Sequence, residues 1–236
     1  MNNLLRSFVI VLTMSIIAGF GSGMAEAATI IYSDFGAFVG ATGATSATGP
    51  LPCAPSAGSS LTVGNVTFGL GPGATGLEFG AAGCNPDFWS SLIPGQDLAI
   101  DAVESITATF SSLVFSAGFR FHEPSRGGSA SDTCFVAVCT DSTFSVELFN
   151  GATSVGLFTF NAPDDVLAFV GVSSTLAFDR MAITELTGTI DDEYYGEFYS
   201  SATPVGVPEP SSLMLLSTGL IGIVARRLWR PRNSTN

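Results

Sequence analysis

Short runs of alternating apolar residues, separated by glycine, proline, asparagine and aspartate, dominate the chain between residues 28 and 201. Long stretches with the 3.6-residue period of a helix are missing from this part of the sequence. The clearest run is 113–121, and successive side chains of a strand point to opposite faces of a sheet. The residues expected on its core face are Leu113, Phe115, Ala117, Phe119 and Phe121. About ten such runs predict an all-β fold, an antiparallel β-sandwich of two packed sheets.

Three local signals refine this prediction. Asn150-Gly151 predicts a tight hairpin turn because both residues tolerate positive φ, and Gly64-Asn65 predicts a second one. Ser33 is the expected N-cap of one short helix over residues 33–39. Residues 40–60 are expected to form a loop, and 105–110 and 113–121 to form two separate strands.

The N-terminus has the three parts of a secretory signal peptide. Arg6 supplies the positive charge, Phe8–Phe20 is the apolar region, and Ala25-Glu26-Ala27 is an A-x-A cleavage pattern. We therefore expect cleavage after Ala27, which makes residues 1–27 a signal helix that is removed. Without cleavage the same segment would be an N-terminal membrane anchor.

The C-terminal segment, residues 208–232, follows a linker at 202–207 and has a fixed order of features. Pro208-Glu209-Pro210 cannot lie in a sheet ladder or a helix interior, because proline fixes φ and lacks the backbone donor. An apolar run of thirteen residues, Leu213–Ala225, follows it. This run is shorter than the roughly 20 residues of a full span, so we expect flanking serines and arginine stems to lengthen it. The expected membrane-anchor residues are Leu213, Leu215, Leu216, Leu220, Ile221, Ile223 and Val224.

Arginines stand on one side of this run only. Arg226, Arg227 and Arg230 follow it, and positive charge at one end predicts that this end faces the cytoplasm. The prediction is therefore a C-terminal transmembrane helix. The alternative is an amphipathic or buried helix of the folded domain, although the run has no polar face before Arg226.

The order of Pro208-Glu209-Pro210, apolar segment and terminal arginines resembles the PEP-CTERM sorting signal of bacteria that produce exopolysaccharide. This resemblance implies an exported protein recognised by an exosortase, a membrane-embedded sorting enzyme. It implies passage across the inner membrane, a transient membrane anchor, and then a place at the cell surface or in the extracellular matrix. It also implies an association with exopolysaccharide and biofilm.

The folded part is similar to jelly-roll ectodomains that often carry such signals. The similarity rests on F-x-F at 158–160, F-V-G-V at 169–172 and F-D-R-M-A-I-T at 178–184. Those ectodomains are themselves similar to carbohydrate-binding modules. The similarity implies a jelly-roll-like sandwich over residues 28–201, and it carries a fold more than a function.

Charge excludes some partners. The chain has a formal net charge of −12, and its expected ectodomain has no lysine and three arginines, Arg120, Arg126 and Arg180. Nucleic-acid binding needs clustered basic residues, so we expect no nucleic-acid partner. An anionic polysaccharide would also be repelled unless a divalent cation bridged the charges.

The four cysteines are an even number in a chain expected to be secreted, which predicts two disulfides with three possible pairings. Each of the favoured pairs, Cys53–Cys84 and Cys134–Cys139, brackets a short segment of loop-like composition. A metal site on cysteine is disfavoured because no C-x-x-C occurs and the sequence has a single histidine.

Catalytic patterns are nearly absent from the sequence, so we expect a protein that is not an enzyme. His122 is the sole imidazole, and we expect a strand-end histidine near Glu123 rather than a general base. No serine lies in a G-x-S-x-G turn. A hydrolase would need only two suitably spaced carboxylates, which twenty acidic residues leave open as an alternative.

Two acidic clusters and several aromatic residues are the remaining candidates. Asp191-Asp192-Glu193 and Asp164-Asp165 offer the oxygen ligands that suit Ca²⁺, but no EF-hand pattern surrounds them. We expect solvated acidic loops and no cofactor, with Ca²⁺ as the alternative. The aromatic residues that would stack on sugar rings in a carbohydrate-binding module are Phe88, Trp89, Tyr194, Tyr195 and Tyr199.

Overall fold

The computed structural model describes residues 28–80, 92–125, 141–187 and 193–206. These residues form antiparallel strands and one short helix, α2, which confirms the all-β prediction. The predicted signal peptide and C-terminal helix lie outside the described residues. The elements are β1 (Thr29–Tyr32), α2 (Phe35–Thr42), β2 (Thr45–Ser46), β3 (Ala54–Gly58), β4 (Ser60–Val63), β5 (Val66–Leu70), β6 (Ala74–Phe79), β7 (Leu98–Ala102), β8 (Ile106–His122), β9 (Thr143–Asn150), β10 (Thr153–Phe160), β11 (Leu167–Thr187) and β12 (Tyr194–Ser201).

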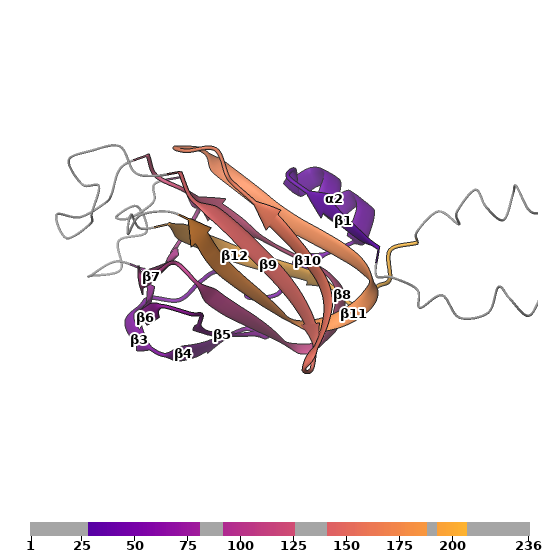
Figure 1. Ribbon diagram of the computed structural model, residues 1–236, viewed down its shortest axis with the longest axis horizontal. Coiled ribbons are helices and arrows are strands. Elements are labelled where there is room, and N and C mark those ends of the chain that lie inside the picture. The colour runs from indigo at the N-terminus through magenta and orange to yellow at the C-terminus, as the bar shows by residue number, and fades with distance from the viewer. Residues whose placement is uncertain (1–27, 81–91, 126–140, 188–192, 207–236) are drawn as a thin grey trace, which may run out of the picture. The chain divides into compact units, whose positions relative to one another are not determined.

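Two long strands, β8 and β11, belong to both layers of the sandwich (Figure 1). Layer one contains β10, β9, the C-terminal part of β11, the N-terminal part of β8, β5 and β4. Layer two contains β1, the N-terminal part of β11, the C-terminal part of β8, β12, β7, β6 and β3, with β2 also paired to β12. Hydrogen bonds therefore join the two layers of the sandwich into one continuous sheet.

The register between β8 and β11 breaks where these strands pass from one layer to the other. Val114 pairs with Phe178 and Ser116 with Ser173, so four residues of β11 lie opposite one residue of β8. A bulge of this kind bends a strand and re-aims its side chains. The two strand segments expected at 105–110 and 113–121 are consequently one bent strand.

The bend reverses which side chains of β8 face the core. Even-numbered residues such as Ala108 are buried before the bend, whereas Ala117 and Phe119 are buried after it. The expected core face is therefore correct for Ala117, Phe119 and Phe121 and wrong for Leu113, which is 47% exposed, and for Phe115, which is only partly buried.

Aromatic contacts across the two layers build the core. Phe68 of β5 meets Phe198 of β12 edge-on at 5.0 Å, and Phe121 of β8 meets Phe144 of β9 at 5.3 Å. Such edge-to-face pairs contribute about 0.5–1.5 kcal/mol each beyond the area they bury. Phenylalanine side chains thus join the two layers, together with the buried valines, leucines and isoleucines of the same cluster.

The helix α2 covers the outer face of layer two. Its N-cap is Asp34 rather than the expected Ser33, because the helix begins at Phe35 and the Asp34 carboxylate accepts the Ala37 N–H at 2.7 Å. A carboxylate at this position also suits the positive end of the helix dipole. Phe38 of the helix packs on Phe169 of β11 at 5.1 Å.

Both predicted hairpins are confirmed. Gly64 and Gly151 have φ of 56° and 59°, in the turns that join β4 to β5 and β9 to β10. The segment 40–60 is not a single loop, because the helix extends to Thr42 and β2 and β3 follow. Cys53 is not a free thiol, and Cys84, Cys134 and Cys139 lie outside the described residues, so the disulfide pairing stays a prediction.

Candidate functional site

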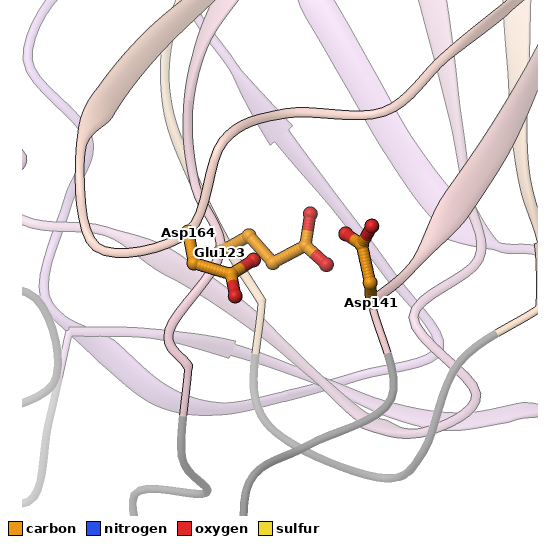
Figure 2. A group of neighbouring side chains, drawn as sticks. All are labelled: Glu123, Asp141 and Asp164. Carbon is orange, nitrogen blue, oxygen red and sulfur yellow. The ribbon is translucent and has the colours of Figure 1, made fainter.

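Three carboxylates from separate loops meet at one end of the sandwich (Figure 2). Glu123 directly follows β8, Asp141 precedes β9, and Asp164 lies between β10 and β11. One carboxylate oxygen from each residue lies within 4.8 Å of those of the other two. We call these three residues the acidic cluster.

Glu123 is the fixed member of the acidic cluster. Its side chain is 1% exposed, and one of its carboxylate oxygens accepts the Ser142 backbone N–H at 2.6 Å. Its backbone carbonyl accepts the N–H of Asp165 at 2.8 Å, which ties the ends of β8 and of the 161–166 loop together. The strand ends therefore place the first carboxylate.

Asp141 and Asp164 are exposed and approach this buried carboxylate from solvent. Burial raises the pKa of Asp164, and the negative charges of Asp141 and Asp165 raise it further. Like charges at short range destabilise each other's ionised form. Carboxylate oxygens are the ligands Ca²⁺ prefers, but that ion usually takes six to eight of them, so the acidic cluster would supply only part of such a site.

The sequence pointed to one of these three residues, Asp164, and missed Glu123 and Asp141 as candidate ligands. Of the other predicted Ca²⁺ candidates, Asp191 and Asp192 lie outside the described residues. Glu193 is fully buried just before β12, so it does not belong to a solvated loop as expected.

His122 lies one residue before the acidic cluster and packs against the fold. Its ring is 8% exposed and stacks on Tyr194, with the ring centroids 5.9 Å apart. Burial lowers the pKa of His122, and the charge of Asp165 partly opposes this. Burial consequently disfavours the charged form of this packed imidazole.

The tyrosines proposed for sugar stacking do not present their rings to solvent. Tyr194, Tyr195 and Tyr199 are at most 7% exposed, and Tyr195 lies in the main core. A carbohydrate-binding face built on these three tyrosines is therefore wrong. Phe88 and Trp89 lie outside the described residues.

The sorting segment begins where the fold ends. β12 ends at Ser201, and the contacts within the chain divide it into one unit that ends at Val205 and another that begins at Gly206. Residues 206–230 match the family model described as the PEP-CTERM protein-sorting motif. The chain carries a PEP-CTERM sorting motif.

The match to the PEP-CTERM motif contains every residue predicted for sorting. It includes Pro208, Glu209 and Pro210, the apolar run 213–225, and the arginines Arg226, Arg227 and Arg230. The recognition made from the sequence is thus confirmed for this segment. Within the described residues no helix has the length and apolar character needed to cross a membrane, and the apolar run is not among them.

Several solved structures resemble the fold at low sequence identity. One is a variant of CBM29-2, from a study of ligand recognition by family 29 carbohydrate-binding modules, with 10% identity and a TM-score of 0.36 over 78% of this chain and 99% of that one. Two others are catalytic domains of a GH87 alpha-1,3-glucanase, in complex with tetrasaccharides and with nigerose, at 13% identity and TM-scores of 0.33 and 0.32. Each covers 77% of this chain and 29% of the glucanase chain. No curated protein matches the chain.

Proposed function

We propose that this chain is an exported, non-catalytic protein of the cell surface or extracellular matrix. Its C-terminal segment holds it at the inner membrane until an exosortase-type enzyme recognises Pro208-Glu209-Pro210 and cuts the chain. The released β-sandwich then associates with exopolysaccharide. The observation that carries this proposal is the PEP-CTERM motif at residues 206–230, directly after the folded domain.

The position of the motif suits recognition by an enzyme. The last strand ends at Ser201, and residues 202–206 have no strand or helix, so the tripeptide follows a short connection outside the sheet. Two prolines keep it out of any ladder. An extended peptide free of the fold is what the groove of a sorting enzyme would require.

Both ends of the described domain lie at the same end of the sandwich. Ala28 exchanges hydrogen bonds with Thr175, its N–H donating to the Thr175 hydroxyl and its carbonyl accepting the Thr175 N–H, each at 3.1 Å. Ser201 pairs with Ser116, which pairs with Ser173. Figure 1 shows the chain entering and leaving at this end.

The opposite end carries the acidic cluster, since Leu167 pairs with His122 and His122 with Tyr194 there. The acidic cluster therefore lies at the end of the described domain that is far from Ala28 and Ser201. The negative charge of the loops that carry this cluster supports a role outside the membrane, where charge favours solubility. The burial of His122 against Tyr194 supports the non-catalytic part of the proposal, because the ring is packed away from solvent, and no cofactor belongs to the proposal.

The test is the replacement of Glu209 in the native host. Glu209→Ala removes the only charge of the tripeptide, and we expect the tail to remain uncleaved and the protein to stay with the membrane fraction. The C-terminus of wild type and variant is read by intact-mass measurement. Asp101→Ala, at an exposed acidic position of β7, is the matched control and should be processed normally. Normal processing of Glu209→Ala would contradict the proposal.

A further inference from the structure

A trough runs along the first residues of β11, beside the 161–166 loop that carries Asp164. It consists of two hollows that share Ser33, Leu167, Ala168 and Phe169. The larger has a volume of about 300 Å³ and extends to Ile31 and Asn161, and the smaller, of about 180 Å³, extends to Asp34 and Arg120. Because ligand pockets usually have volumes of roughly 300–1,000 Å³, the trough is large enough for a small ligand or one segment of a polymer.

Exposed apolar side chains gather in the larger hollow. Ile31, Val166 and Leu167 are 45%, 44% and 38% exposed, and all three line it. Ile31 comes from β1, whereas Val166 ends the loop before β11 and Leu167 begins that strand, so segments far apart in the sequence meet here. This gives the trough an apolar wall in contact with solvent.

The smaller hollow contains a cation held in place by its neighbours. The guanidinium of Arg120 lies 5.1 Å from the centre of the Phe35 ring, and its Nε donates to the Tyr199 hydroxyl at 3.4 Å. That hydroxyl in turn donates to Glu197 at 2.6 Å. The bond from Arg120 to Tyr199 uses one of the five N–H groups of the guanidinium. The four N–H groups on its terminal nitrogens are left for a ligand.

An acceptor lies in the same hollow. Asp34 uses Oδ1 to cap α2, and its second oxygen is not needed for that bond. Ser33 adds a hydroxyl that both hollows share. The hollow therefore contains strong donors and strong acceptors with no excess of positive charge, next to an apolar wall.

We propose that this trough binds an uncharged carbohydrate segment. Sugar hydroxyls both donate and accept hydrogen bonds, which matches Arg120 and Asp34, and the C–H faces of a sugar ring match the apolar wall. An anionic chain fits less well, because Asp34 lies in the hollow and the chain has a net charge of −12. The proposal deepens the matrix association above, but the binding does not need sorting, so the two can fail separately.

The experiment measures binding of the full chain, purified in detergent, to biotinylated dextran, laminarin and galactomannan on a sensor surface, with alginate as the anionic comparison. We expect retention on at least one neutral polysaccharide. Arg120→Ala and Leu167→Glu should each weaken the affinity about tenfold or more. The first variant removes the donor for sugar hydroxyls, and the second puts a charge on the apolar wall. Leu157→Glu, at a 65% exposed leucine of β10 outside the trough, is the matched control and should bind as wild type does.

Several results would overturn the assignment. These are no retention on any neutral polysaccharide, an unchanged affinity of Leu167→Glu, an equal loss in Leu157→Glu, or tighter retention on alginate. Leu167 is a surface residue, so its variant is informative even where Arg120→Ala disturbs the contact with Phe35. Glu209→Ala should bind as wild type does, which separates a failed trough from a failed sorting signal.

Discussion

The acidic cluster and the single carboxylate of Glu197 have opposite surroundings in this sandwich. In the acidic cluster, Glu123 meets Asp141 and Asp164, so carboxylates face carboxylates. On the outer face of layer two, Glu197 accepts hydrogen bonds from Tyr199 and Ser46, and Arg120 lies behind that tyrosine. Like charges crowd the acidic cluster, whereas donors surround Glu197. The difference indicates that the loop end is under electrostatic strain while the outer face is stabilised.

The largest expected effect is at the buried member of the acidic cluster. Glu123→Ala removes the acceptor of the buried Ser142 N–H, and an unsatisfied buried donor costs about 1–3 kcal/mol. We expect the free energy of unfolding, measured by urea denaturation, to fall by that amount.

Glu123→Gln is the matched control for this variant. It keeps an oxygen for the Ser142 N–H and removes the charge, so most of the lost stability should return. Equal losses in both variants would show that the charge of Glu123, and not its hydrogen bond, holds the loops together.

A smaller loss is expected on the outer face. Tyr199→Phe removes the hydroxyl between Arg120 and Glu197 and keeps the ring that packs on Phe35 at 4.7 Å. The variant loses two partly buried hydrogen bonds, the short one to Glu197 and the longer one from Arg120, and this should cost about 1–2 kcal/mol. Thermal unfolding at neutral pH measures it, and a variant as stable as wild type would mean that this network contributes only packing.

Sequence patterns predicted what is local and failed where distant segments meet. Asn150-Gly151 specifies its own turn, and the alternation at Phe119 and Phe121 identifies a buried face without knowledge of the partner strand. The prediction that Leu113 faces the core is wrong because a bulge bends β8. This bulge depends on the pairing of β8 with β11, which the alternation within β8 does not reveal.

The candidate site was hidden for the same reason. Glu123, Asp141 and Asp164 are spread over three loops, and only the antiparallel pairing of β8, β9, β10 and β11 brings these strand ends together. The available signal was weak: each residue stands within a few positions of a strand end. The trough could not be predicted from the sequence for a similar reason. It depends on the pairing of β1 with β11, which are more than a hundred residues apart in the sequence.

The smallest expected effect has the opposite sign and concerns Asp164. Asp164→Asn removes one charge from the acidic cluster, and because this side chain is exposed, solvent screening limits the gain to about 0.5 kcal/mol. The raised pKa of Asp164 means that the folded protein holds this proton more tightly than the unfolded chain does. Stability from the protonated carboxyl is therefore fully present below its ordinary pKa of 3.8 and is lost as pH rises through the raised folded value.

The advantage of Asp164→Asn over wild type in melting temperature should accordingly be present at pH 7, shrink as the pH falls through the raised folded pKa, and be gone below pH 3.8, in melting curves recorded across that range. Asp101→Asn, at an exposed acidic residue of β7, is the comparison variant. Burial raises the pKa of Glu78 and Asp101 raises it further, so Asp101 acts on one neighbouring carboxyl, whereas Asp164 lies near two other carboxylates. The change in Asp101→Asn should therefore be smaller. Repeating the pH 7 measurement in CaCl₂ and in NaCl of equal ionic strength separates screening from ion binding. Equal melting temperatures in the two salts fit a solvated cluster, because screening depends on ionic strength alone. A rise in melting temperature that occurs only in CaCl₂, and in wild type but not in Asp164→Asn, would instead identify the three carboxylates as a cation site. The acidic cluster would then stabilise the fold, as the surroundings of Glu197 do.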